Sequence, residues 1–164
     1  DATSTCLSCP SGKFCLGGNG RTNANSEASD CPAGLLTRFA GAKSSAQCFT
    51  VAGYGRRAVR GANGVIAYSG VPCAVGTYNV GGNTAACQKC GNGLTTNSTE
   101  STSPDACLAP AGSYLDKGTG KKCPKGTYTT DLNRAGVCTP CNEGVTTAAE
   151  GSNSAAACDR AESA

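Results

Sequence analysis

Residues 123–158 read CPKGTYTTDLNRAGVCTPCNEGVTTAAEGSNSAAAC. Four cysteines occur in this segment, with the spacing Cys-x14-Cys-x2-Cys-x16-Cys. Its apolar residues show no helical period and only short alternation. A segment with so few large apolar side chains cannot bury enough surface to be held by packing, so we expect disulfides to hold it.

The composition of the whole chain supports this interpretation. The 164 residues include 13 cysteines and 23 glycines, with five tyrosines, three phenylalanines and no tryptophan. Cysteine at this density is typical of oxidising compartments, so we expect a secreted or cell-surface protein. The net charge of +3 is smaller than that of most disordered chains, and the basic residues form no patch that predicts nucleic-acid binding. No apolar stretch reaches the length of about 18 residues that predicts a membrane span.

The cysteine pattern repeats along the chain. Cysteines at 73, 87, 90 and 107 have nearly the spacing of those in 123–158. The neighbouring residues agree as well, because Gly76-Thr-Tyr78 corresponds to Gly126-Thr-Tyr128 and Gly93-Leu-Thr-Thr96 corresponds to Gly144-Val-Thr-Thr147. A third, degenerate copy ends at Cys48. We therefore predict cysteine-rich repeats at about 1–48, 49–107 and 108–158, followed by a tail at 159–164.

The predicted fold is small and disulfide-rich. Three tandem repeats of short β-hairpins and loops would form an elongated rod, because units in series contact mainly their neighbours. In each repeat, the glycine of Gly-x-Tyr supplies a positive φ or a close backbone approach. The tyrosine two residues later is placed to cover a disulfide.

We expect consecutive cysteines to pair within each repeat. Sequential pairing gives Cys31–Cys48, Cys73–Cys87, Cys90–Cys107, Cys123–Cys138 and Cys141–Cys158. Crossed pairing, first with third and second with fourth, stays open at this point. The first repeat departs from the pattern, because Ala28 stands where a cysteine is expected. Cys6, Cys9 and Cys15 are left for local pairing, and one of them is free or bonded outside this chain.

The pattern resembles a known repeat. Cys123-Pro-Lys-Gly-Thr-Tyr128, Cys138-Thr-Pro-Cys141 and Gly144-Val-Thr-Thr147 are similar to the ephrin-receptor-like cysteine-rich repeat, and also to the first modules of tumour-necrosis-factor-receptor domains. In the latter, the first disulfide joins consecutive cysteines. Such repeats also occur in surface proteins of algae and other protists, including mastigoneme-like proteins of extracellular filaments. The resemblance therefore implies a fold and an extracellular location, and function does not follow from fold alone.

Other chemistry fits the sequence less well. Cys-x-x-Cys at 6/9, 87/90 and 138/141 suits zinc, but the first repeat breaks the quartet that zinc would need. A thioredoxin-like redox motif needs a helix after it, and no helical pattern follows these pairs. The carboxylates are scattered and the chain has no histidine. We expect neither an enzyme nor a bound metal or cofactor.

Two surface features stand out. Asn97-Ser98-Thr99 is an N-glycosylation sequon, and Ser98–Ser103 either carries O-linked sugars or is a solvated loop. An insertion at about 56–68 contains Asn63-Gly64 between two β-favouring runs, which predicts a hairpin. Its arginines form either a solvated face or contacts for acidic groups or glycans. The hairpin either lies along its own rod or meets a neighbouring subunit; in the second case we expect these contacts: Arg57, Val65, Ile66 and Tyr68.

These observations lead to two functional hypotheses. The first is a non-enzymatic structural protein that associates with copies of itself into a filament or surface coat, with glycans as further partners. The second is a receptor-type ectodomain that binds a protein ligand.

Overall fold

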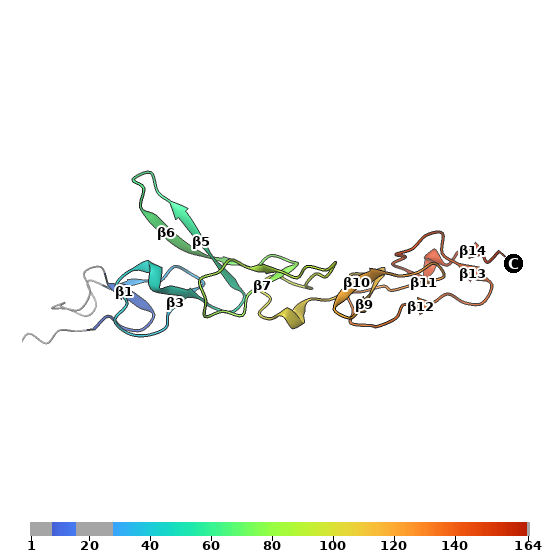
Figure 1. Ribbon diagram of the computed structural model, residues 1–164, viewed down its shortest axis with the longest axis horizontal. Coiled ribbons are helices and arrows are strands. Elements are labelled where there is room, and N and C mark those ends of the chain that lie inside the picture. The colour runs from blue at the N-terminus through green and yellow to red at the C-terminus, as the bar shows by residue number, and fades with distance from the viewer. Residues whose placement is uncertain (1–7, 16–27, 164) are drawn as a thin grey trace, which may run out of the picture. The chain divides into compact units, whose positions relative to one another are not determined.

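The computed structural model describes residues 8–15 and 28–163 (Figure 1). These residues contain seven two-stranded sheets and three one-turn 3-10 helices. The strands pair as β1 (Lys13–Cys15) with β2 (Ala28–Asp30), β3 (Leu35–Thr37) with β4 (Cys48–Thr50), β5 (Tyr54–Arg60) with β6 (Ile66–Pro72), β7 (Thr77–Tyr78) with β8 (Gln88–Lys89), β9 (Ser113–Asp116) with β10 (Thr119–Lys122), β11 (Thr127–Tyr128) with β12 (Thr139–Pro140), and β13 (Val145–Thr146) with β14 (Arg160–Ala161). The helices are η1 (Ser45–Gln47), η2 (Pro104–Ala106) and η3 (Ala155–Ala157). The predicted small, disulfide-rich fold of short hairpins and loops is confirmed.

The chain divides into two compact units. The first comprises Asp1–Ala74, Tyr78–Gln88 and Glu100–Ser103, and the second comprises Val75–Thr77, Lys89–Thr99 and Pro104–Ala164. Strands β1–β6 belong to the first unit and β9–β14 to the second. The predicted repeat boundaries follow the sequence pattern rather than these units, and they stay predictions.

Six disulfides connect the described cysteines. Five of them join the pairs expected from sequential pairing: Cys31–Cys48, Cys73–Cys87, Cys90–Cys107, Cys123–Cys138 and Cys141–Cys158. The bonded Cα atoms in these five lie 5.5–5.8 Å apart, which is the usual separation for a disulfide. Crossed pairing is therefore not the arrangement in the structure.

The sixth disulfide, Cys9–Cys15, compensates for the missing cysteine of the first repeat. Cys15 lies directly opposite Ala28 in the antiparallel pairing of β1 with β2. Its sulfur therefore bonds Cys9 from β1, whereas in the other two repeats the equivalent cysteine, Cys87 or Cys138, directly precedes the second strand of the pair. Cys9 and Cys15 are both buried. Cys6, the remaining cysteine, lies outside the described residues.

Half-cystines and small polar residues make up the interior. The buried apolar group within 8–15 and 28–163 consists of six cysteines with Leu35, Ala42 and Ala109. The buried polar residues are Thr37, Thr50, Asn79, Thr96, Ser101, Thr129 and Thr147. Buried polar groups are costly unless hydrogen-bonded, so the threonines need internal partners.

One such hydrogen bond recurs three times. A glycine N–H at the start of each cysteine loop donates to the hydroxyl of a buried threonine: Gly12 to Thr37 at 2.6 Å, Gly76 to Thr96 at 2.9 Å, and Gly126 to Thr147 at 3.0 Å. The three glycines have φ between 80° and 85°. This left-handed backbone turns each N–H toward the second loop, and only glycine adopts it without strain. The motifs Gly-x-Tyr and Gly-x-Thr-Thr therefore belong to one interaction.

Candidate functional site

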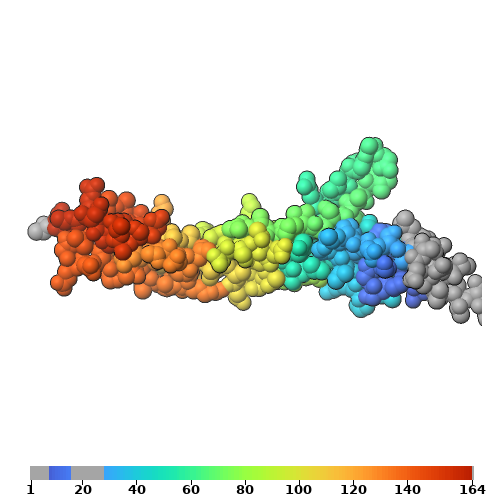
Figure 2. Space-filling model, turned by 180° about the vertical axis from the view of Figure 1, so that it is seen from behind, coloured from blue at the N-terminus to red at the C-terminus, as the bar shows by residue number. Residues whose placement is uncertain are grey.

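Residues 57–67, the outer half of hairpin β5–β6, are all exposed. Figure 1 and the space-filling view in Figure 2 show this outer half extending away from the rest of the first unit. The two strands pair over seven residues each, from Tyr54 opposite Pro72 to Arg60 opposite Ile66. The hairpin is thus longer than the predicted insertion at 56–68.

The turn of this hairpin contains the predicted Asn63-Gly64. The N–H of Gly64 donates to the carbonyl of Gly61 at 2.9 Å, and the N–H of Gly61 donates to the carbonyl of Val65 at 2.8 Å. Gly64 has a φ of 78°, and the Asn63 amide oxygen accepts the N–H of Val65. This arrangement is a three-residue loop that ends in a left-handed glycine, a common hairpin connection.

The predicted contact residues do not all have the same surroundings. Arg57, Val65 and Ile66 are exposed, whereas Tyr68 is half-buried. The structure adds two exposed side chains that the sequence did not single out, Val59 and Val71. Val59 and Val71 share one face of the hairpin and Ile66 lies on the other, so the hairpin exposes apolar side chains on both faces.

Arg56 attaches the inner half of the hairpin to the first unit. Its N–H donates to the Ala85 carbonyl at 2.8 Å, and its Nη1 donates to the carbonyls of Ala46 at 2.8 Å and Cys48 at 3.2 Å. The guanidinium carbon lies 4.0 Å from the centre of the Tyr68 ring, a cation–π contact. Arg56 is therefore a structural residue, not a member of a solvated face. Sequence reasoning could not separate it from the arginines beside it.

Two exposed side-chain hydrogen bonds, one in each unit, depend on donors that lose their protons in alkaline solution. The Tyr54 hydroxyl donates to Glu100 Oε1 at 3.0 Å, and this hydrogen bond and the carboxylate charge raise the pKa of the Tyr54 phenol. In the second unit, the hydrogen bond from Lys121 to Asp116 and the carboxylate charge raise the pKa of the Lys121 ammonium. Both groups hold their protons more tightly when folded. Each contact is present at neutral pH and is lost as the pH rises through the raised pKa.

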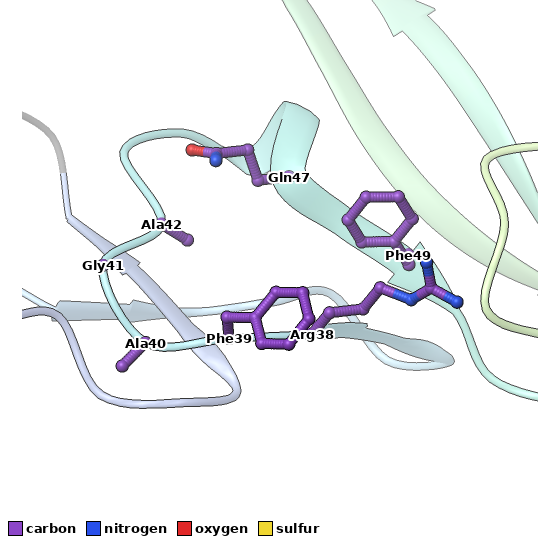
Figure 3. Close-up of a pocket in the computed structure, with 7 residues that line it drawn as sticks. All are labelled: Arg38, Phe39, Ala40, Gly41, Ala42, Gln47 and Phe49. Carbon is purple, nitrogen blue, oxygen red and sulfur yellow. The ribbon is translucent and has the colours of Figure 1, made fainter.

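An aromatic recess lies beside β3 and β4 (Figure 3). Arg38, Phe39, Gln47 and Phe49 line this shallow cavity of about 260 Å³. The Arg38 guanidinium lies 5.3 Å from the centre of the Phe49 ring, and Phe39 is 78% exposed. Pockets for drug-sized ligands start at about 300 Å³ and enclose most of their ligand, so this recess is too small and open for one.

Asn97 of the predicted sequon lies on the surface of the second unit. Its side chain lines a shallow cavity of about 390 Å³ together with Leu108 and Leu132. Ser101 belongs to the run Ser98–Ser103, for which O-linked sugars and a solvated loop were the two alternatives, and it is buried. A sugar on Asn97 would lie beside two leucines, whereas Ser101 is not accessible in the folded chain.

The described cysteines are all committed to disulfides. Cys87 bonds Cys73 and Cys90 bonds Cys107, so the members of this Cys-x-x-Cys pair are not bonded to each other, and the pair at 138/141 is arranged in the same way. A disulfide sulfur carries no thiolate charge and is not a zinc ligand. Within 8–15 and 28–163, no group of three or more His, Cys, Asp or Glu is placed to hold a metal ion.

Residues 67–107 and 112–158 each match a protein-family model described as tyrosine-protein kinase ephrin type A/B receptor-like. Together the two segments make up more than half of the chain. The chain belongs to the ephrin-receptor-like family. Each matched segment of this ephrin-receptor-like chain contains four cysteines, so the resemblance carried by Cys-Pro-x-Gly-x-Tyr, Cys-x-x-Cys and Gly-x-Thr-Thr is confirmed.

The family and the disulfides together indicate that this ephrin-receptor-like chain is extracellular. None of the described helices is long and apolar enough to cross a membrane. No curated protein and no solved structure matches the chain. The likeness to tumour-necrosis-factor-receptor modules and to protist surface proteins stays a prediction. The first repeat and most of hairpin β5–β6 lie outside the matched residues.

Proposed function

We propose that this ephrin-receptor-like chain is a non-enzymatic structural protein of the cell exterior, which associates with copies of itself into a filament or coat. Hairpin β5–β6 carries the proposal. Its outer half exposes Val59, Val65 and Ile66, of which Val65 is 61% exposed. A heterologous contact that does not close on itself would produce a fibre.

Negative-stain images of the purified chain at rising concentration test this proposal. Fibres or sheets are expected to appear as concentration increases. Val65→Ser combined with Ile66→Ser should suppress them, because it removes apolar area from the hairpin tip. Val137→Ser is the matched control, since Val137 is 76% exposed but lies in the second unit. A monodisperse monomer at every concentration would contradict self-assembly.

A receptor-type ectodomain is the second candidate function. The description of the matching family, which names ephrin receptors, favours it. In that case the chain would stay monomeric, and the hairpin would contact a different protein. The same images separate the two candidates.

We also propose that Asn97 carries an N-linked glycan. Asn97 is exposed and stands in the sequon Asn97-Ser98-Thr99, and the indicated compartment is the one in which sequons are modified. The first sugar would cover part of the recess beside Leu108 and Leu132.

Peptide mass spectrometry of the chain secreted from eukaryotic cells is expected to find a glycan on Asn97. Thr99→Ala should abolish it, because the sequon needs a hydroxyl residue at that position. Thr102→Ala, an exposed change outside the sequon, should leave it in place. An unmodified Asn97 in the secreted wild-type chain would refute this prediction.

A further inference from the structure

The two edges of hairpin β5–β6 differ in charge. On β5, Arg57 and Arg60 are exposed, and charged residues are a common device that keeps a strand edge from pairing with another chain. On β6, residues 66–69 read Ile-Ala-Tyr-Ser and carry no charge. Pro72 is the single proline of β6 and lies at its inner end, so it does not block pairing along the outer part of the strand. The outer part of β6 therefore has neither a charged residue nor a proline to keep another strand from pairing with it.

The backbone of β6 presents free groups along this edge. Gly61 and Val65 form a hydrogen-bonded pair, and alternation along an antiparallel ladder then turns the N–H and C=O groups of Ile66 and Tyr68 away from β5. The N–H of Arg56 on β5 follows the same alternation, and it is taken by Ala85. Within the part of the chain that the structure describes, no residue bonds the outward groups of Ile66 and Tyr68.

The rest of the first unit contacts other parts of the hairpin. A Cβ on Gly70 would lie 2.1 Å from the Ala33 carbonyl oxygen, and a Cβ on Gly55 would lie 2.5 Å from the Cys87 nitrogen. Gly70 and Gly55 stand on opposite faces of the sheet, because Gly70 pairs with Arg56, the neighbour of Gly55. These contacts cover both faces near the base, and η1 also lies close to β6. None of the described residues hydrogen-bonds the outward backbone groups of Ile66 and Tyr68 on the β6 edge.

We infer that two copies of this chain pair β6 with β6, antiparallel and about a two-fold axis at Ala67. The hairpins would join into a four-stranded sheet. Ile66 of one copy would stand opposite Tyr68 of the second copy, and the pair would exchange both backbone hydrogen bonds. A β-branched residue opposite an aromatic one is a favourable cross-strand pair.

The alternative pairing, β5 with β5, is less favourable because of charge. It would bring Arg57 and Arg60 of both copies onto one short seam, with no acidic residue on either hairpin to offset them. Pairing through β6 places these arginines on the two outer strands. The strand that pairs with the β6 edge is therefore β6 of a second copy.

This inference rests on the self-association proposed above, and it specifies one contact. A two-fold contact closes on itself and gives dimers, so a fibre needs a further contact elsewhere. Dimers that do not form fibres would support β6 pairing and contradict the filament. Fibres that form equally well when β6 is changed would support the filament and contradict β6 pairing.

Cysteine crosslinking tests the register. Ala67 would face Ala67 of the second copy in a non-hydrogen-bonded pair, where Cα atoms lie about 4.5 Å apart, within the range of a disulfide. Under mild oxidation, Ala67→Cys is expected to give a covalent dimer with a peptide joining the two introduced thiols. Val59→Cys is the matched control, because Val59 pairs with Ala67 in the hairpin and shares its face. The two copies of that residue would be roughly 14 Å apart in the four-stranded sheet.

A charge substitution gives an independent measurement. In sedimentation equilibrium, Ala67→Asp is expected to weaken dimerisation by about tenfold, since it sets two like charges opposite each other. Val137→Asp, the same change at an exposed residue of the second unit, should leave the dimerisation constant unchanged. Equal crosslinking at positions 59 and 67, or dimerisation that Ala67→Asp does not weaken, would overturn β6 pairing. A wild-type chain that sediments as a monomer throughout would overturn it as well.

Discussion

Replacing both Cys123 and Cys138 with alanine is expected to lower the free energy of unfolding by about 3 kcal/mol. The bond closes a loop with a sequence separation of 15, and its removal frees the unfolded chain to adopt many more conformations. Apolar packing contributes little to holding this loop. Cys123 is fully buried, but no large apolar side chain of the described residues is buried with it in the second unit. Urea unfolding followed by far-UV circular dichroism measures the loss.

The Cys9–Cys15 disulfide provides the comparison. Its sequence separation is 6, so the same relation gives a smaller loss of about 2 kcal/mol for the double alanine variant. Losses that rise with loop length would show that covalent closure stabilises the fold. If neither variant lost as much as about 1 kcal/mol, apolar packing would have to be the main source of stability, contrary to what we infer from the composition.

Gly112→Ala is expected to cost about 3 kcal/mol of stability. Gly112 has a φ of 78°, which strains any residue with a Cβ. A Cβ at this position would also lie 2.3 Å from the carbonyl oxygen of Gly151, so the backbone would have to move. That movement would disturb two hydrogen bonds, the Gly112 N–H to Thr129 and the Cys123 N–H to the Gly112 carbonyl, both 2.9 Å long.

Gly118→Ala is the matched control for this prediction. Gly118 connects the strands of the same hairpin, β9–β10, and its φ of 80° is nearly that of Gly112. Apart from the glycine itself and its two chain neighbours, nothing lies within 4 Å of the position its Cβ would take. Alanine there should cost about 1 kcal/mol, from backbone strain alone. Equal losses for the two variants in urea unfolding would show that the close approach to Gly151 is not a source of instability.

The disulfide-rich fold could be predicted because its elements are local in sequence. In the second and third repeats, each disulfide joins cysteines with separations of 14 to 17, and the repeat made the pattern visible. The first repeat shows the limit of this reasoning. Pairing of Cys9 with Cys15 depends on Cys15 lying opposite Ala28. The spacing of cysteines along the chain does not predict this strand register.

The turn of the hairpin could be located from the sequence, but the length of its two strands could not. Asn63-Gly64 indicated the turn, yet strands β5 and β6 continue past the predicted ends. Gly55 and Gly70 are poor strand residues by propensity, and they were no guide to its length. In the structure their missing side chains allow Cys87 and Ala33 to approach the backbone closely, so packing outweighs propensity.

Glu100 is another position where tertiary contacts decide the conformation. Its φ is 59°, and its N–H bonds the Cys73 carbonyl as the N–H of Gly151 bonds the Cys123 carbonyl in the next repeat. Sequence comparison of the repeats sets glutamate against glycine here and predicts no shared backbone. The hydrogen bond from Tyr54 holds the glutamate side chain and supports the strained backbone.

The amino-acid sequence alone determined the disulfide framework of the repeats, the turn glycines and the extracellular class, because these depend on residues that are close along the chain. The tertiary structure decided which arginine is structural, how far the hairpin extends, and how the first repeat closes without its cysteine. Those properties depend on register and on contacts between segments far apart in sequence, and no short-range pattern records them.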